Sequence, residues 1–469
     1  MPELQEKCTL QVVRAYDRSP IKEVATDYAK ALEDKLTRAA TAFSDRDQWL
    51  QPYERIEILS RLASLMDAER DQLSRLIAQE GGKPLTDAIV ETGRAIDGVR
   101  NAAEELRNFA GREIPMGLTP ASAGRWAFTI KEPTGVVAAI SAFNHPLNLI
   151  VHQVAPAIAT GCPVIVKPAV PTPLCCMEFV RLAREAGLPE QWCQTFLTDD
   201  NALAEKLVTD ARVGFLSFIG SARVGWYLRS KLAPGTRCAL EHGGVAPVIV
   251  DRTADLDSTV ESLVKGGYYH AGQVCVSVQR IFVHVEIYDT FLDRFAARVQ
   301  KLRVGDPLLL ETEVGPLILP READRVQSWI EEAAAQGARV VTGGERLSPT
   351  TIRPAVVVDA PAEAKLSEQE VFGPVTCVYR YTKMDDAIKT ANSLPFAFQA
   401  SIFTEEIGSA LRAAERLNAS AVMINDHTAF RTDWMPFAGR KQSGYGIGGI
   451  PWSMREMTEE KMIVLRRTV

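Results

Sequence analysis

Between residues 135 and 241 the sequence alternates short apolar runs with longer segments of helical periodicity. The apolar runs GVVAAISAF, PVIVKP, VGFLSFI and RCALE have the length and composition of buried strands. Strands that are buried on both faces and joined by helices form a parallel sheet that is covered on both sides. We therefore expect an α/β domain that binds its ligand at the carboxyl ends of these strands.

The segments around this series predict the rest of the organisation. Residues 20–110 have apolar positions at helical spacing and predict helices. A second α/β series runs over residues 251–425, with the strand QRIFVHV and helices near 286–302 and 321–336. The pieces Arg125–Ile130 and KMIVLRRTV are strand-like but fall outside both series. The sequence thus predicts two α/β domains and two additional strands.

Size and charge exclude several classes of protein. At 469 residues the chain is too long for a single hydrophobic core, and its net charge of −6 gives no basic footprint for nucleic acid. The start, MPELQEKCTL, carries charges where a signal peptide needs an apolar core. No apolar stretch approaches the ~20 residues that span a bilayer. We expect a cytoplasmic protein with no nucleic-acid or membrane partner.

The chain has eight cysteines without CxxC spacing, which predicts reduced thiols rather than disulfides. The role of each cysteine therefore depends on its own surroundings. Cys275 follows a glycine in AGQVCVSVQR, among small apolar residues. Inert packing is the commoner role of a free cysteine, so this segment alone does not establish a nucleophile.

Polar residues follow the predicted strands of the first series. Glu241 could serve as a general base or face solvent, and the Asn144 amide could donate to an oxyanion. Lys167 could reach a ribose or phosphate, and Gly220 and Ser221 form a strand-to-helix turn suited to a pyrophosphate. Each of these residues taken alone also has a commonplace structural explanation.

The order and context of these pieces are specific. The chain resembles the aldehyde dehydrogenase superfamily over nearly its whole length, through SAFNHP, IVKPA, FIGSARVG, LEHGG, GQVCVSVQR, EVFGPV and MPFAGRKQSG. The resemblance implies a Rossmann-like cofactor domain, a catalytic domain and a small β oligomerisation arm. It also implies oxidation of an aldehyde to a carboxylic acid, with NAD or NADP as the cofactor.

By that resemblance Cys275 is the nucleophile, and Asn144 and the backbone N–H of Cys275 hold the oxyanion of a thiohemiacetal. Its collapse passes hydride to the nicotinamide and leaves a thioester, which water activated by Glu241 hydrolyses. The thiolate needs a lowered pKa, which a nicotinium charge or a helix N-terminus could provide. No metal site is implied.

The resemblance also assigns residues to the two ligands. The expected cofactor contacts are Ile140, Ala142, Phe143, Lys167, Ala169, Val170, Phe218, Gly220, Ser221, Val224, Gly243, Glu370 and Phe372. The expected substrate contacts are His145, His152, Val274, Val276 and Phe437.

The same resemblance implies domain boundaries and an assembly. Residues 1–117 and 134–243 form the dinucleotide-binding domain, and residues 244–453 form the catalytic domain. Residues 118–133 and 454–469 provide oligomerisation strands, which predict a homodimer or homotetramer. The alternative is that the tail folds back and pairs within its own chain.

Two departures from the family pattern concern the cofactor. Many NAD-preferring members carry a glutamate where this chain has Val170, so the repulsion that would exclude a 2′-phosphate is absent. The glycine-rich turn usual before the FIGS strand is replaced by LTDDNALAE, which indicates a differently built adenine side.

Two further departures concern the substrate. His145 and His152 occupy positions that are often aromatic, and a spacing of seven would place them on one face of a helix. The two histidines indicate a polar substrate tunnel that binds hydroxyl or anionic groups. The alternative is that both are structural histidines whose hydrogen bonds are already made within the protein. Arg431 and Asp433 lie in an extended loop, where we expect a solvated charge pair. These features resemble the branch that contains lactaldehyde dehydrogenases and favour a small oxygenated or acid-bearing aldehyde.

Three rival functions stay open. A coenzyme A-acylating relative would lack the glutamate that this chain has at Glu241. A catalytically silent structural homologue would have no need of Cys275, Glu241, Asn144 and Lys167 together. A thiol esterase without redox chemistry would not bind a dinucleotide.

Overall fold

The first α/β unit is built on a six-stranded sheet with the order β19-β9-β8-β5-β6-β7. The structure is a computed structural model that describes residues 9–467. Strands β5 to β9 run parallel, and β19 adds an antiparallel edge beside β9. The strands are β5 (Val136–Ile140), β6 (Val164–Lys167), β7 (Cys193–Thr195), β8 (Val213–Ile219), β9 (Arg237–Glu241) and β19 (Gly444–Tyr445).

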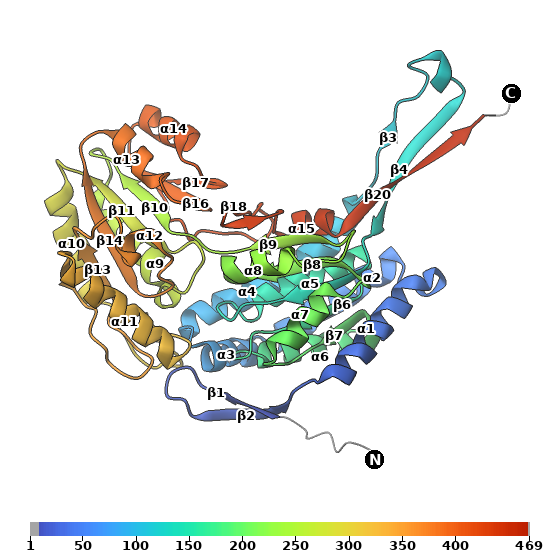
Figure 1. Ribbon diagram of the computed structural model, residues 1–469, viewed down its shortest axis with the longest axis horizontal. Helices are drawn as coiled ribbons and strands as arrows, with labels where there is room; N and C mark the ends of the chain where they lie inside the picture. Colours follow the sequence, from blue (N-terminus) through green and yellow to red (C-terminus); the bar gives the residue numbers. More distant parts are fainter. Residues whose placement is uncertain (1–8, 468–469) are drawn as a thin grey trace.

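Helices cover both faces of this sheet, as the buried strands require (Figure 1). They are α1 (Ala29–Ser44), α2 (Pro52–Ala68), α3 (Arg70–Gly81), α4 (Leu85–Glu105), α5 (Asn148–Thr160), α6 (Leu174–Glu185), α7 (Asn201–Thr209) and α8 (Ala222–Arg229). Helix α5 is buried along its whole length against α2 and α4. It ends where Gly161 adopts a left-handed φ of 83°, which a residue without a side chain accommodates at little cost.

The second unit is a seven-stranded sheet with the order β12-β13-β14-β11-β10-β16-β17, parallel except for the β12–β13 pair. The strands are β10 (Ala246–Val250), β11 (Val278–His284), β12 (Arg339–Thr342), β13 (Ala355–Val358), β14 (Val375–Tyr381), β16 (Gln399–Phe403) and β17 (Ala421–Ile424). The helices are α9 (Leu256–Tyr268), α10 (Tyr288–Gln300), α11 (Pro320–Ala335), α12 (Lys365–Glu368), α13 (Met384–Ala391) and α14 (Ile407–Arg416). These elements confirm the α/β fold predicted from the sequence.

A three-stranded arm projects away from both units (Figure 1). It consists of β3 (Glu113–Ile114), β4 (Arg125–Pro133) and β20 (Thr458–Arg466) in the order β20-β4-β3. β20 pairs with β4 antiparallel and without interruption, from Thr458 opposite Pro133 to Arg466 opposite Arg125. The two additional strands of the sequence therefore pair with each other within one chain.

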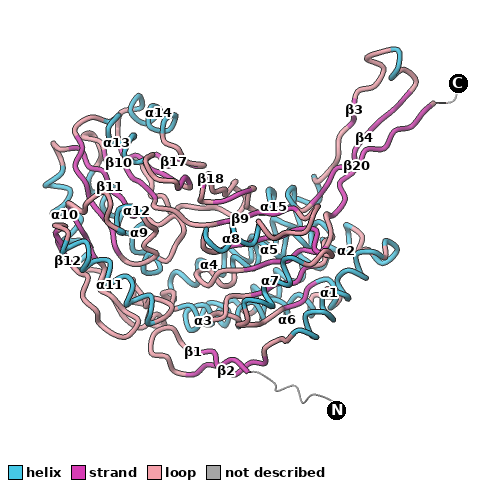
Figure 2. The backbone as a smooth tube through the Cα atoms, viewed as in Figure 1, coloured by secondary structure: helices cyan, strands magenta, loops and turns pink. Residues whose placement is uncertain are grey.

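Two segments differ from the sequence predictions. Residues 20–25 are not helical, because β2 (Pro20–Ala25) pairs with β1 (Thr9–Val13) in a hairpin that packs on the first unit through Leu174 and Leu197. Residues 444–453 were assigned to the catalytic domain, but β19 joins the first sheet. Helix α15 (Ile450–Glu456) packs on α4 and α5 of the first unit. The short strands β15 (Phe396–Ala397) and β18 (Arg440–Lys441) form a separate antiparallel pair, and Figure 2 shows β18 between the two units.

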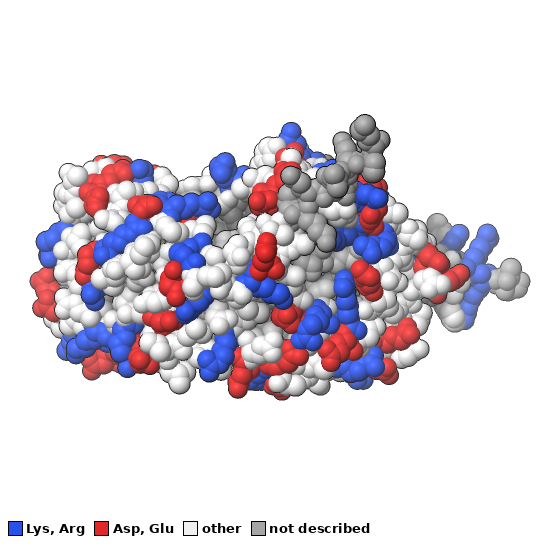
Figure 3. All heavy atoms as spheres, turned by 90° about the horizontal axis from the view of Figure 1, so that it is seen from below, with Lys and Arg blue, Asp and Glu red and all other residues white. Residues whose placement is uncertain are grey.

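The surface carries both signs of charge. On the face shown in Figure 3, acidic and basic side chains are interspersed rather than gathered into one patch. No helix within residues 9–467 has the length and apolar character needed to cross a membrane. Cys8 lies outside the described residues, and the other seven cysteines are free thiols.

Candidate active site

A cavity of about 780 Å³ lies where the carboxyl ends of the first sheet face loops of the second unit. The residues that line this cavity include ones predicted from the sequence for catalysis, for the cofactor and for the substrate. They are Ile140, Ala142, Phe143, Asn144, His145, Ala169, Phe218, Gly220, Ser221, Val224, Glu241, Gly243, Val274, Cys275, Val276, Glu370, Phe372 and Phe437. Lys167, Val170 and His152 do not line it. The structure therefore brings Cys275, Glu241 and Asn144 together around one cavity.

Cys275 reaches this cavity from the loop between η5 (Tyr269–Gly272) and β11. The loop reverses sharply, because His270 and Ala271 adopt left-handed φ angles of 49° and 54°. Cys275 is partly exposed, whereas the other six described cysteines are buried. Burial raises the pKa of the Cys275 thiol to about 12, and the positive charge of Arg431 acts against that rise. The lowered pKa that the chemistry requires is therefore not present in the ligand-free site, and Cys275 leads into a strand rather than a helix.

Asn144 is held in a fixed orientation. Its side chain is buried, and Nδ2 donates to the backbone carbonyl of Gln273 at 2.9 Å. Gln273 is itself anchored, since its Oε1 accepts from the N–H of Ile318 at 3.0 Å. An amide nitrogen carries two hydrogens, so Asn144 keeps a second donor in the cavity beside Cys275.

Glu241 extends from the end of β9 into the same cavity. A side chain at Gly448 would collide with its carboxylate, so the absence of one leaves room for Glu241. Burial raises the pKa of Glu241, and the charge of Arg431 partly opposes that rise. A carboxylate with a raised pKa is a stronger base, which suits proton abstraction from water.

The other end of the cavity has features of a dinucleotide site. Ser221 precedes α8 and makes no side-chain cap there, and Gly220, Ser221 and Val224 at this helix start line the cavity. The Glu370 carboxyl lies against Gly243, where a side chain would displace it, and its Oε1 is buried without a partner. Phe372 packs edge-on against Phe143, with ring centroids 5.8 Å apart. Burial raises the pKa of Glu370 to about 8. An unpartnered carboxyl oxygen in this position fits a ribose hydroxyl.

Comparison with known proteins agrees with this geometry. The model of the aldehyde dehydrogenase family matches residues 3–463. The chain belongs to the aldehyde dehydrogenase family. It is thus an oxidoreductase that acts on aldehydes.

Individual relatives cover nearly the whole enzyme. The 3-sulfolactaldehyde dehydrogenase of Priestia aryabhattai is 36% identical over 97% of this chain and 94% of its own. The lactaldehyde dehydrogenase of Methanocaldococcus jannaschii is 34% identical over 98% of this chain and 97% of its own. The crystal structure of a glyceraldehyde-3-phosphate dehydrogenase from Methanocaldococcus jannaschii, complexed with NADP, matches with a TM-score of 0.94 and 33% identity. It covers 99% of this chain and 100% of its own.

The segments that the sequence analysis assigned to the adenine side lie at the end of β6 and in α7. Val170 lies in a turn after β6, outside the cavity lining. The segment that replaces the glycine-rich turn forms α7, and the Asp200 side chain caps it by accepting from Ala202 N–H. Lys167 ends β6, where burial lowers the pKa of its ammonium and Asp199 opposes that effect.

The expected helical pairing of His145 and His152 is wrong. Helix α5 begins at Asn148, so His145 lies in the turn before it, while His152 is buried within the helix. His145 faces the cavity, with Nε2 at 3.3 Å from the Tyr269 hydroxyl. His152 lies behind the cavity wall and reaches the substrate side only through other residues.

The expected solvated pair of Arg431 and Asp433 is also wrong. Asp433 is buried, and two ordered hydrogen bonds from Arg94, at 2.8 and 3.1 Å, hold its carboxylate. It also accepts from Asn148 Nδ2 at 3.1 Å and lies 2.6 Å from His152 Nε2. Arg94 carries no sequence signal for this role, because it is one of many arginines on predicted helices and its partner is 339 residues away.

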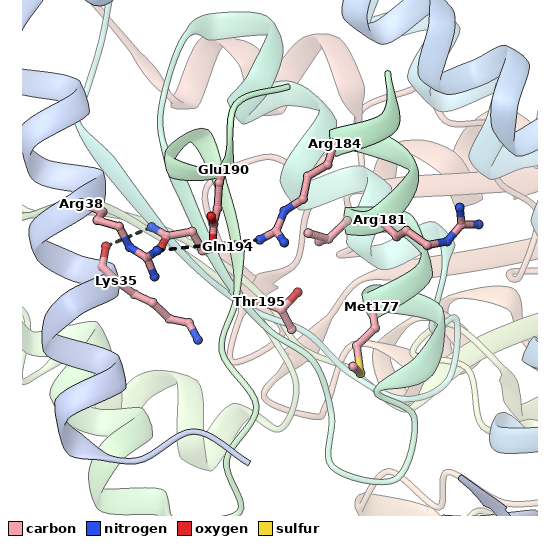
Figure 4. A pocket seen from close by; sticks show the side chains of 9 residues that line it. Lys35, Arg38, Met177, Arg181, Arg184, Glu190, Gln194 and Thr195 are labelled. Carbon is pink, nitrogen blue, oxygen red and sulfur yellow. Dashed lines mark hydrogen bonds and ion pairs between the residues drawn. The ribbon is translucent and has the colours of Figure 1, made fainter. Parts of the chain in front are cut away.

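A second hollow, of about 440 Å³, lies on the surface between α1 and α6 (Figure 4). Lys35, Arg38, Arg181 and Arg184 line it, but each is engaged by an acidic side chain. Glu190, for example, pairs with both Arg38 and Arg184. These side chains form a surface ion-pair network, and their contacts do not indicate a catalytic or ligand-binding role.

Proposed function

We propose that the enzyme oxidises a small oxygenated or acid-bearing aldehyde to the carboxylic acid, with NAD+ or NADP+ as the oxidant. One observation carries the proposal. Cys275, Asn144 and Glu241 come from three distant parts of the sequence and line a single cavity with the residues suited to a dinucleotide.

The chain's own groups can perform both halves of the reaction. The Cys275 thiol gives up its proton to water and its sulfur bonds to the aldehyde carbon as the carbonyl π bond opens, so the carbonyl oxygen becomes an oxyanion. The free N–H of Asn144 and the backbone N–H of Cys275 are the donors available to that oxygen. The thiohemiacetal loses two electrons and a proton, and becomes a thioester.

Hydrolysis then releases the acid. Glu241 takes a proton from a water molecule, whose oxygen bonds to the thioester carbon as the carbon–sulfur bond breaks. The products are the carboxylic acid and the regenerated Cys275 thiol. Glu241 lies in the cavity with a raised pKa, which supports this role.

The dinucleotide would lie along the opposite part of the cavity. Ser221 and the start of α8 suit its pyrophosphate, and Glu370 suits a ribose hydroxyl. Phe372 and Phe143 would enclose the nicotinamide end. When bound, the oxidised dinucleotide supplies the two-electron acceptor. The NADP that accompanies the similar archaeal structure supports the same use here.

The names of the relatives support the substrate class. Lactaldehyde and 3-sulfolactaldehyde are short and oxygenated, and the second also carries an anionic group. The cavity offers matching polar groups in His145 and Arg431.

Glu241→Gln tests the mechanism by separating its halves. With lactaldehyde and NADP+ or NAD+, the variant should release a burst of reduced dinucleotide and then turn over about 10²- to 10⁴-fold more slowly, because only hydrolysis lacks its base. Cys275→Ala should show neither phase and still bind the dinucleotide. Full turnover by either variant would contradict the proposal.

Product analysis separates the rival functions. The free acid should form with and without coenzyme A. An acyl-CoA product would favour the acylating alternative, and failure to bind any dinucleotide would favour the esterase or structural alternatives.

A further inference from the structure

Arg431 is a cation in the active-site cavity that makes no hydrogen bond or ion pair to a carboxylate within residues 9–467, although it feels the charge of Glu241 in the same cavity. Its Nη2 lies 3.2 Å from His152 Nδ1, which is the one hydrogen bond it makes within residues 9–467. Its Nε is buried without a partner. Since a guanidinium has donors on every nitrogen, part of its binding capacity faces the cavity unused.

The contact with His152 orients Arg431 without neutralising it. A guanidinium can only donate, so His152 Nδ1 must accept. The ring proton therefore lies on Nε2, which donates to Asp433 at 2.6 Å. Burial, reinforced by the charge of Arg431, lowers the pKa of His152 to about 4, so the imidazole is neutral at pH 7.

Asp433 does not cancel the charge of Arg431 either. Its carboxylate is already paired with Arg94 through two hydrogen bonds. A chain of hydrogen bonds thus runs from Asp433 through His152 to the positively charged Arg431. An unpaired buried cation is costly, which favours an anion in the space beside it.

The position of Arg431 is close to the reacting centre. Its guanidinium carbon lies 3.6 Å from the centroid of the Phe437 ring. Phe437 packs with Val274, Val276 and Cys275 in one apolar cluster. An aldehyde bound at Cys275 would therefore place a group two or three carbons away near Arg431.

We propose that Arg431 binds an anionic terminal group of the substrate, and that His152 and Asp433 are the positioning residues that aim it. The substrate class is a short aldehyde that carries a carboxylate or a sulfonate. This inference rests on the proposed function and narrows it. A planar guanidinium with unused donors can bind either oxyanion through paired hydrogen bonds.

The test compares charged and neutral aldehydes of equal length. 4-Oxobutanoate, its methyl ester and 3-oxopropane-1-sulfonate are assayed with wild type, Arg431→Gln and Arg431→Lys. Wild type should prefer one or both anions over the ester. Arg431→Gln should lose about 10- to 100-fold more in kcat/KM for the preferred anion than for the ester, as loss of a charged hydrogen bond to the anion implies, while any loss shared by both compounds reports the effect of Arg431 on the Cys275 thiol. Arg431→Lys should retain part of the preference.

His152→Asn tests the positioning role. It should raise KM for the preferred anion and leave kcat and the ester nearly unchanged, because the cation is present but no longer aimed. Arg38→Gln is the matched control, since it removes one positive charge from an exposed surface site. Circular dichroism and dinucleotide binding check that each variant is folded.

The outcomes distinguish a failure of the inference about Arg431 from a failure of the proposed function. Equal losses on the anions and the ester in Arg431→Gln would mean that Arg431 serves Glu241 or Cys275 and would overturn this inference alone. A wild type that prefers the ester would overturn it as well. A wild type that oxidises none of the three compounds would contradict the proposed function together with the inference.

Discussion

At the scale of single residues, the charged side chains around Cys275 have opposite effects on the pKa of its thiol. Burial and the carboxylates of Glu370 and Glu241 disfavour the thiolate, while Arg431 favours it. The net effect raises the pKa of Cys275 to about 12, which favours the thiol over the thiolate in the ligand-free protein.

Alkylation of Cys275 by iodoacetamide should be slow in the ligand-free protein and should rise about tenfold per pH unit between about pH 7 and 10 without levelling off, since the thiolate reacts and the raised pKa lies above that range. At a fixed pH, Arg431→Gln should be labelled more slowly, because the stabilising cation is gone. Mass spectrometry of the labelled peptide measures the rate, and Cys275→Ala gives the background. Fast labelling that is independent of pH would contradict a raised pKa.

Val170 tests which dinucleotide the enzyme prefers. Val170→Glu should shift the preference towards NAD+, because a carboxylate after β6 accepts from ribose hydroxyls and repels a 2′-phosphate. The expected change is about 1–3 kcal/mol, measured as the ratio of kcat/KM with NAD+ and NADP+. Val170→Gln is the control for shape. An unchanged ratio would place the adenine end elsewhere, which the replaced glycine turn already suggests.

At the scale of elements, the start of α5 depends on a buried ion pair. Glu91 Oε1 on α4 accepts from the N–H groups of Leu147 and Asn148 at 3.0 and 3.1 Å. Its other oxygen pairs with Lys83, and both side chains are fully buried. The turn that carries Asn144 leads directly into this anchored helix start, so Glu91 helps to fix the position of Asn144.

Glu91→Gln should therefore lower the free energy of unfolding by about 3–5 kcal/mol, because Lys83 is left as a buried, unpaired charge. It should also lower kcat as the Asn144 turn loosens. Urea denaturation followed by circular dichroism measures the first effect. Adding Lys83→Met should recover much of the stability, since an apolar side chain needs no partner. A single variant as stable as wild type would show that the pair is not required.

The sequence predicted elements whose pattern is local. β5, β6, β8 and β9 follow from their apolar runs, and α5 ends at Gly161 as expected. The hairpin β1–β2 and the edge strand β19 were missed, because their pairing depends on partners far along the chain.

The residues of the candidate site were likewise predicted only in part. Motif residues such as Cys275 and Glu241 could be predicted because each stands in a distinctive segment, GQVCVSVQR and LEHGG. The partnership of Arg94 with Asp433 was not, because it joins a helix and a loop 339 residues apart. Tertiary pairing of this kind leaves no periodic signal in the sequence.

At the scale of the whole molecule, the arm exposes an apolar face. Trp126, Phe128 and Ile130 alternate outward along β4 and are 58, 38 and 36% exposed. Leu465 and Ile463 stand opposite Trp126 and Phe128 on β20 and extend the same face. Since the outer edge of β20 is also unpaired within residues 9–467, the arm offers both apolar surface and backbone groups to a neighbouring subunit.

We expect the protein to sediment as a homodimer or homotetramer, and Trp126→Glu combined with Leu465→Glu to shift it towards smaller species, because two charges would enter the apolar face. Leu310→Glu is a matched control, since that leucine is 64% exposed and lies away from the arm. Sedimentation velocity at micromolar concentration measures the effect. If wild type sediments as a monomer, or if the double variant assembles as wild type does, the exposed face serves no subunit contact.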